Sequence, residues 1–298
     1  MSVVHAGRRV GHVAAGATGH PFVKLWMRFG YVVRGVIYLL PAVLALKLAL
    51  VSGSQKSSSL TQGGAIATLG RQPMGHAILI AIAAGLAGYA LWGFTRAIFD
   101  PLDRGKSPHG VFKRLGYAWS GIVHVGLFIA TMKLIGGASS PITSNEDWTA
   151  ELLSKPLGAW MVGIIGVAWI FGGGLSQVVS GWKGTIQKDL DLAGRSEKER
   201  WWAKNLARVG IVSRGLVFTM IGIFLVSAAV HARAEEALGM DGVLLQLLEQ
   251  PYGRILLGIL SIGLIAFGVF SVLCARWMRV RPLESGSPPS GPAPGGVS

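Results

Sequence analysis

The sequence predicts an all-α membrane protein with six transmembrane helices in three parallel two-helix repeats, accompanied by short interfacial helices on the outer face. Three features predict this fold: a low charge content, six long apolar runs and a motif that recurs three times. Of the 298 residues, 51% are hydrophobic and only 14% are charged, whereas a soluble domain carries about 25% charged residues. This composition argues against both a soluble enzyme and a disordered chain.

Six apolar runs, none of which contains Asp or Glu, are long enough to cross a bilayer, which takes roughly 20 residues. We expect the spans at 30–51, 74–99, 115–136, 157–182, 209–230 and 253–278. The runs are apolar all round, whereas helices on the surface of a soluble bundle carry a polar stripe. Residues 1–24 and 282–298 are expected to be disordered, and residues 184–204 to form a cytoplasmic loop.

A short motif recurs before the first, third and fifth spans and divides the chain into repeats at 25–100, 111–183 and 205–281. It reads Arg28-Phe29-Gly30-Tyr31, Arg114-Leu115-Gly116-Tyr117 and Arg208-Val209-Gly210-Ile211, followed by Arg34-Gly35, Ser120-Gly121 and Arg214-Gly215. The second helix of each repeat follows Pro73, Pro156 or Pro251, and proline is typical of the first helical position. The preceding stretches, such as Trp148–Leu153 and Val243–Leu248, are expected to be interfacial helices.

The distribution of basic residues predicts the orientation. Eighteen Lys and Arg lie in the head, the 100–114 loop, the 183–208 loop and the tail, whereas the opposite loops hold five. Positively charged loops stay in the cytoplasm, so both termini are expected there. The net charge of +14 is therefore an orientation signal that also attracts anionic lipid headgroups, and no nucleic-acid partner is expected. Because each repeat has two spans, the repeats share one orientation; a pseudo-threefold ring and a linear array both remain open.

The Arg-x-Gly-Tyr-x-x-Arg-Gly opening, the Gln-Pro-x-Gly start of the second helix and the run Gly85–Trp92 resemble the bacterial integral membrane family catalogued as domain of unknown function 1206. The resemblance covers residues 25–280 as three copies of a two-helix unit. The chain departs from the motif at Ser120, where the arginine is missing, and at Ile211, where the tyrosine is missing. The resemblance implies the fold and a location in the bacterial inner membrane, and it implies no activity.

Arg34 and Arg214 lie at equivalent places, one turn inside the membrane boundary. One interpretation is that both side chains snorkel, so that the guanidinium groups reach the lipid phosphates. The other is an anion or lipid-headgroup site that they build together with Arg28, Arg114 and Arg208, because guanidinium groups bind phosphate in bidentate fashion.

His124 is the one ionisable group deep within a span, and its repeat equivalents are Tyr38 and Phe218. A proton relay would usually include a carboxylate, and the spans contain none. The sequence therefore favours a packed ring with one hydrogen bond, with His124 and Tyr38 as a candidate intramembrane polar site.

Sequence signatures of catalysis, metal ligation and cofactor binding are not found, so we expect no enzyme and no cofactor. The leading hypothesis is a structural, interaction or lipid-binding membrane protein, with a membrane protein or a second copy as a candidate partner. The alternative is a transporter or channel for ions or small solutes, with its pathway along the repeat axis. A polar cavity at mid-membrane depth would favour transport, and a dry centre sealed by glycines would favour assembly.

Overall fold

A computed structural model describes residues 21–50, 62–138 apart from 101, 103 and 106, 145–185 and 190–278. The chain is an all-α membrane protein, and six helices of the described residues are long and apolar enough to cross a bilayer. The elements are α2 (Pro21–Leu50), α3 (Gln62–Gly70), α4 (Gly75–Phe99), α5 (Pro108–Ile135), α6 (Asn145–Leu153), α7 (Gly158–Ala168), the π-helix η2 (Trp169–Leu175), α8 (Ser176–Trp182), α9 (Glu197–His231), the 3-10 helix η4 (Ala234–Glu236), α10 (Met240–Leu248) and α11 (Gly253–Trp277).

Three helices begin earlier than the expected boundaries. Helix α2 starts inside the segment 1–24 that was expected to be disordered, and α9 starts inside the expected loop 184–204. Helix α9 begins where Ser196 and Glu199 form a capping box, and α5 begins where the Ser107 hydroxyl accepts a hydrogen bond from the Gly110 N–H. At 35 residues, α9 is about 50 Å long and exceeds the ~30 Å hydrocarbon core of a bilayer. The rest of the expected head and the tail 282–298 lie outside the described residues.

The second helix of each repeat starts at a glycine, two residues after the proline, rather than at the proline itself. The intervening residues Met74, Leu157 and Tyr252 are left-handed, with φ between 61° and 64°. The turn brings the glycine against the end of the preceding short helix: a Cβ on Gly75 would lie 1.8 Å from the Gly70 carbonyl oxygen. Only glycine fits this close approach, which explains the Pro-x-Gly pattern.

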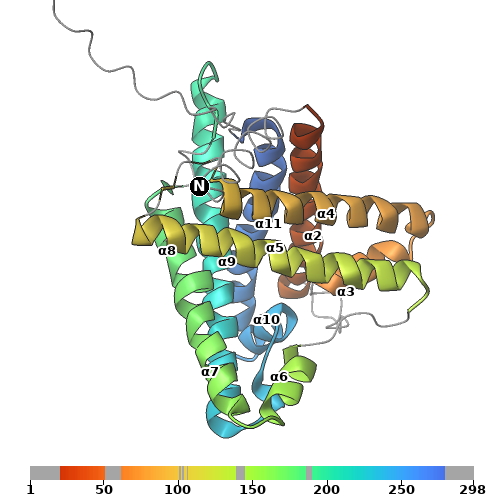
Figure 1. Ribbon diagram of the computed structural model, residues 1–298, viewed down its shortest axis with the longest axis vertical. Helices are drawn as coiled ribbons and strands as arrows, with labels where there is room; N and C mark the ends of the chain where they lie inside the picture. Colours follow the sequence, from red (N-terminus) through yellow and green to blue (C-terminus); the bar gives the residue numbers. More distant parts are fainter. Residues whose placement is uncertain are drawn as a thin grey trace, which may run out of the picture.

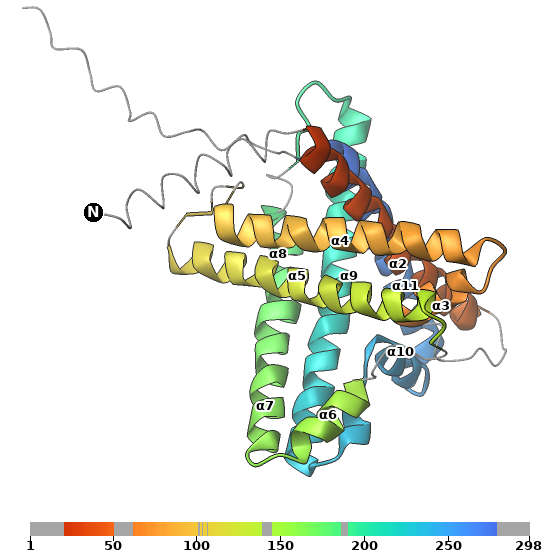
Figure 2. The same ribbon diagram turned by 45° about the vertical axis from the view of Figure 1, so that its right-hand side comes forward.

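The long helices pack in a series of neighbours that begins and ends with a helix of repeat 2. Helix α5 packs on α4, α4 on α2, α2 on α11, α11 on α9, and α9 on α7, η2 and α8. Figures 1 and 2 show that α2, α7, α9 and α11 run roughly alongside one another, and that the α4–α5 hairpin lies across them. The contacts between the long helices therefore form an open series, which has α5 at one end and the α7–η2–α8 segment at the other.

The second glycine of each motif makes the contact between neighbouring repeats. A Cβ on Gly35 would lie 2.8 Å from the Gly268 carbonyl oxygen of α11, and one on Gly215 would lie 3.0 Å from the Gly174 carbonyl oxygen of η2. Gly121 and Gly93 meet in the same way between α5 and α4. Close backbone approach through small residues is typical of helix association in lipid, and here it joins all three repeats.

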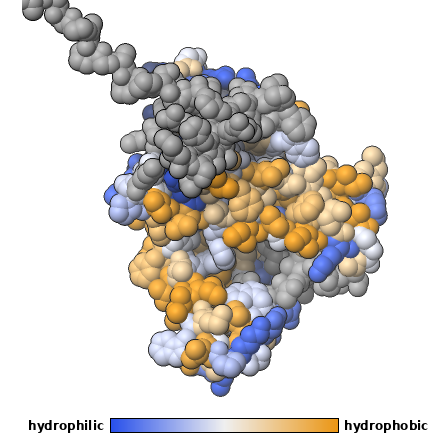
Figure 3. Space-filling model, in the orientation of Figure 1, coloured by the Kyte–Doolittle hydropathy of each residue, from blue (hydrophilic) through white to orange (hydrophobic). Residues whose placement is uncertain are grey.

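Large apolar side chains remain exposed along the long helices, which fits a lipid-facing surface. Figure 3 shows them across the α4–α5 hairpin and along α7. A soluble protein seldom exposes continuous apolar surface of this extent. The multi-pass membrane location therefore rests on the surface as well as on the length of the helices.

Candidate functional site: a cationic cavity between α5 and α7

The first glycine of each motif makes the contact within a repeat, and repeat 2 lacks this contact. A Cβ on Gly30 would lie 2.7 Å from the Tyr89 backbone nitrogen, and one on Gly210 would lie 2.5 Å from that of Phe267. A Cβ on Gly116, the equivalent in repeat 2, would meet nothing within 4 Å. The two helices of repeats 1 and 3 are thus in close contact, whereas α5 and α7 of repeat 2 stand apart.

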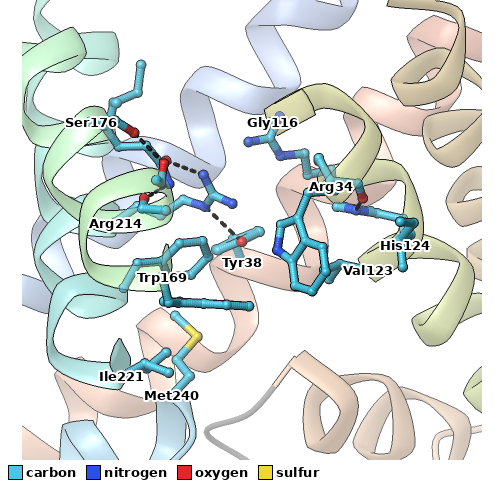
Figure 4. A pocket seen from close by; sticks show the side chains of 18 of the residues that line it. Arg34, Tyr38, Gly116, Val123, His124, Trp169, Ser176, Arg214, Ile221 and Met240 are labelled. Atoms are coloured by element: carbon cyan, nitrogen blue, oxygen red, sulfur yellow. Dashed lines mark hydrogen bonds between the residues drawn. The ribbon is translucent and has the colours of Figure 1, made fainter. Parts of the chain in front are cut away.

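A cavity of about 1590 Å³ occupies the space at this opening. Its central wall carries two arginines, one histidine and several aromatic rings, which come from α2, α4, α5, η2, α9 and α11: Arg34, Tyr38, Tyr89, His124, Trp169, Arg214, Phe218 and Phe267. Figure 4 shows Arg34, Tyr38, His124, Trp169 and Arg214 around it. The polar side chains that the sequence analysis located within the spans, those of Arg34, Tyr38, His124 and Arg214, therefore all line this cavity.

The side chain of Arg34 extends from α2 into the cavity. Its guanidinium donates a hydrogen bond to the Tyr89 hydroxyl, and its Cζ lies 4.9 Å and 4.8 Å from the ring centroids of Tyr89 and Phe267. Its Nε is buried and has no hydrogen-bond partner among the described residues. Cation–π contacts of this kind contribute up to about 2 kcal/mol each when desolvated, so the aromatic rings hold the charge in place without neutralising it.

Arg214, at the equivalent position of repeat 3, enters the same cavity from α9. Its Nε donates to the Tyr38 hydroxyl over 2.9 Å, and another guanidinium nitrogen donates to the Gln177 side-chain oxygen. Its Cζ lies 4.2 Å from the Phe218 ring and 5.1 Å from the Phe267 ring. Both arginines thus lie against Phe267, so the two positive charges converge on one region of the cavity.

The π-helix η2 lies beside Arg214. The Gln177 side-chain nitrogen donates to the Gly173 carbonyl, and the Ser176 hydroxyl donates to the Gly172 carbonyl. These bonds satisfy carbonyl groups in the widened turn and leave the Gln177 oxygen to accept from Arg214. Single π-helical turns inside α-helices are frequent at functional sites.

The charge of the cavity is unbalanced. Neither Arg34 nor Arg214 is part of a salt bridge among the described residues. The acidic lining residues come from the short connecting segments α6, η4 and α10: they are Glu146, Glu235 and Asp241. The other connections contribute basic residues, and α4 contributes the buried Arg96. The middle of the cavity is therefore cationic.

His124 and Tyr38, the predicted polar pair, both line this cavity and are both buried. The Nδ1 of His124 donates to the Ser120 carbonyl over 2.7 Å, because a carbonyl oxygen can only accept. Its Nε2 is buried without a partner among the described residues, and its ring lies 4.4 Å from that of Tyr89. In the structure the buried His124 ring thus packs on Tyr89 and makes one hydrogen bond, to the Ser120 carbonyl.

The remaining three predicted arginines lie elsewhere. Arg114 donates to the Ala97 and Ile98 carbonyls at the end of α4, over 2.8 Å and 3.0 Å. Arg208 donates twice to the Trp182 carbonyl at the end of α8. Both side chains cap the C-terminus of the preceding helix, where carbonyl groups lack partners and cations are favoured. The exposed Arg28 lies in a second, shallow pocket with Arg195 and Arg276.

Three aromatic residues of the cavity were not singled out from the sequence as site residues: Tyr89, Trp169 and Phe267. The repeat carries a signal for two of them, because Tyr89 and Phe267 occupy the same position, fourteen residues after the glycine that starts the second helix. Within the described residues, no group of three or more His, Cys, Asp or Glu could hold a metal ion.

Comparison with known proteins agrees with the repeat. The family model described as Domain of Unknown Function (DUF1206) matches the chain three times, at residues 29–100, 115–184 and 209–278. "Uncharacterized protein YxxB" of Bacillus subtilis (strain 168) is 32% identical over 253 residues, which is 85% of this chain and 90% of that protein. No solved structure matches the chain. The chain belongs to the DUF1206 family and carries three copies of its domain.

Proposed function

We propose that this protein is a non-catalytic membrane protein that binds an anionic amphiphile, an acidic lipid, in the cavity between α5 and α7. The anionic headgroup lies between Arg34 and Arg214, and the apolar tail leaves through the opening of repeat 2. The observation that carries the proposal is the pair of guanidinium groups that face one cavity and have no salt-bridge partner among the described residues.

The cost of these charges supports an anionic ligand. An arginine at the centre of a membrane helix costs about 2.5–3.5 kcal/mol, and this figure is an upper limit for Arg34 and for Arg214, which lie nearer the membrane boundary. The ring contacts of Arg34 and Arg214 offset part of this cost. A phosphate or carboxylate group offsets more, because charge-assisted bonds to guanidinium are about twice as strong as neutral hydrogen bonds. The Nε of Arg34, which has no partner among the described residues, is one donor for such a group.

The wall of the opening suits an acyl chain. Helix α5 lines it with the exposed side chains Phe112, Leu115, Trp119 and Ile122, and Leu175 of η2 lies among the residues opposite. Burying apolar surface contributes roughly 25 cal/mol per Å². A ligand that combines an anionic head with an apolar tail therefore matches both parts of the cavity.

The proposal includes the orientation in the membrane. Both termini lie in the cytoplasm of a bacterial cell, and Arg114 and Arg208 mark the cytoplasmic ends of the spans. Lys113 and Arg104, which line the cavity near this side, attract an anion from the inner leaflet. On the outer side the lining carries Glu146, Glu235 and Asp241 against one arginine, Arg71, so its net charge is negative and repels an anion.

The test compares the lipids that remain bound after purification in mild detergent, identified by native mass spectrometry. Wild-type protein is expected to retain acidic over neutral lipid, and Arg34→Gln/Arg214→Gln to lose this preference. Each charged hydrogen bond is worth about 1.5–3 kcal/mol, so affinity should fall at least about tenfold. The control is Arg200→Gln, an exposed arginine of α9 outside the cavity. Equal acidic-lipid retention by the double variant and wild type would refute the proposal.

Transport is a second candidate, because the cavity lining includes residues from both sets of connecting segments. Thr68 and Asp241 belong to one set, and Arg104 and Thr185 to the other. Proteoliposomes would then move a fluorescent acidic lipid between leaflets, and Arg34→Gln/Arg214→Gln would abolish the movement. Binding without movement would leave the binding role alone.

A further inference from the structure

We infer that Trp119, Ala168 and Trp169 are the residues that create the cavity, because they prevent the helix contact that closes repeats 1 and 3. The inference has two parts. The first, which concerns the distance of α5 from α7 and η2, does not depend on the proposed function. The second, which concerns ligand binding, rests on it. The three residues act as a wedge, which sets the width of the opening and thereby admits a ligand with an apolar tail.

Repeats 1 and 3 show what the closed contact requires. In repeat 1, Val33 lies directly on Gly85, where an added Cβ would be 2.1 Å from the valine Cγ2. In repeat 3, Ser213 lies on Gly263 in the same way, with its Oγ 1.8 Å from such a Cβ. These contacts leave no room for even one more carbon atom on the glycine side. The closed pairing therefore needs a small or medium side chain on the first helix and glycine on the second.

Repeat 2 carries larger residues at both positions. Counted from the motif glycines, Trp119 is the equivalent of Val33 and Ser213, and Ala168 is the equivalent of Gly85 and Gly263. A tryptophan cannot occupy a site that lacks space for a methyl group, and overpacking forces backbones apart. The substitution pattern thus accounts for the separation of α5 from α7, and for the empty space beside Gly116.

Trp169 completes the wedge. Its equivalents, Leu86 and Leu264, are fully buried in the core. In repeat 2 the Trp119 and Trp169 rings meet edge to face instead, with centroids 5.6 Å apart, a geometry that stabilises aromatic pairs. The two rings bridge the opening while the backbones stay apart, and both line the cavity.

The test gives repeat 2 the residues of repeat 1, in Trp119→Val/Ala168→Gly/Trp169→Leu. Spin labels at Ile129→Cys on α5 and Ile164→Cys on α7, two exposed positions, report the separation by pulsed electron resonance in lipid nanodiscs. The equivalent pair in the closed repeat 3, Ile223→Cys and Ile259→Cys, serves as the internal reference. All proteins carry Cys274→Ala, which removes the buried native cysteine.

The separation of the label pair in repeat 2 is expected to exceed the reference in the otherwise wild-type protein and to fall to the reference value in the triple variant. Retained acidic lipid is expected to be lost at the same time. Trp160→Leu/Trp202→Val, which removes two exposed tryptophans that do not line the cavity, should change neither readout. Should the triple variant fail to fold, Trp119→Val alone is expected to shorten the separation in part.

The outcomes separate the inference from the proposed function. An unchanged separation in the folded triple variant, or in Trp119→Val if that alone folds, overturns the wedge. A shortened separation with undiminished acidic lipid supports the wedge and overturns ligand binding in the cavity.

Discussion

The threefold repeat offers an internal control for one prediction, because the same motif glycine is confined in repeat 3 and unconfined in repeat 2. The change is Gly→Ala at Gly210 and, separately, at Gly116. A Cβ added at Gly210 would lie 2.5 Å from both the N and Cα atoms of Phe267, whereas nothing lies within 4 Å of the corresponding point at Gly116. We expect Gly210→Ala to destabilise the protein and Gly116→Ala to leave it as stable or more stable.

The magnitude follows from two opposing contributions. Carbon atoms in contact prefer a separation of about 3.5–4.0 Å, so α9 and α11 must separate by roughly 1 Å, and overpacking of this kind costs about 1–3 kcal/mol. Alanine in a helix is favoured over glycine by about 0.5–1 kcal/mol. Because this gain is common to both variants, it cancels in the comparison. The difference in the free energy of unfolding between the two variants should therefore be about 1–3 kcal/mol.

The assay is unfolding in mixed detergent micelles with increasing SDS, followed by tryptophan fluorescence. Gly30→Ala, which would bring a Cβ to 2.7 Å from the Tyr89 nitrogen, should behave like Gly210→Ala and serves as a second confined position. If Gly116→Ala is as destabilising as Gly210→Ala, repeat 2 is closed like the others, and the reasoning that places a cavity there is wrong.

Three further predictions concern residues outside the cavity. Arg208→Met should lower the free energy of unfolding by about 0.3–1 kcal/mol, measured by the same SDS titration, because it removes an exposed cation that donates to the Trp182 carbonyl at the end of α8; no loss would contradict its role as a cap. Gly158→Ala should destabilise by at least about 1–3 kcal/mol, since a Cβ there would lie 1.9 Å from the Leu152 carbonyl oxygen, whereas exposed Leu157 should accept glycine without loss. Hydrogen bonds from Ser227 and His231 hold the pKa of Glu236 below its usual 4.5, so the stability that the ionised Glu236 contributes is present above pH 4.5 and lost as the pH falls through the lowered pKa. The protection of the amides at 228–240, measured relative to their intrinsic exchange rate at each pH, should therefore fall on acidification in wild type and much less in Glu236→Gln.

The sequence predicted the spans and the repeat well, because both depend on local patterns. An apolar run of 20 residues has few alternatives to a membrane helix. The motif Gly35, Gly121 and Gly215 recurs because each repeat makes the same contact with the preceding one. The starts of the first helices were predicted less well: α2, α5 and α9 begin before the expected boundaries at 30, 115 and 209, because their first turns lie outside the apolar runs. The second helices begin at Gly75, Gly158 and Gly253, within one residue of the expected boundaries.

The site was predicted only in part, because its residues are brought together by helices far apart in the chain. Arg34, Arg214, His124 and Tyr38 do share one cavity, but the charge and depth of the two arginines alone fit snorkelling as well. From the sequence, Arg114 and Arg208 fit a headgroup site equally well, because both are arginines of the repeated motif before a span. In the structure they donate hydrogen bonds to carbonyl groups of the preceding helix.

The opening itself could have been found by comparing the repeats position by position. Trp119 and Ala168 differ in size from their equivalents, but a size difference acquires meaning only once the equivalent residues are known to touch. Val33 on Gly85 and Ser213 on Gly263 supply that knowledge. The contacts that repeats 1 and 3 share therefore explain why α5 and α7 of repeat 2 stand apart. The sequence of repeat 2 alone does not reveal this.

The most direct test of the central claim is an experimental density map of the wild-type protein in nanodiscs that contain acidic lipid. We predict density for a lipid whose anionic headgroup lies between Arg34 and Arg214 and whose tail passes Trp119 between α5 and α7. A map in which α5 packs against α7, or in which the two guanidinium groups face only water or protein, would contradict the claim.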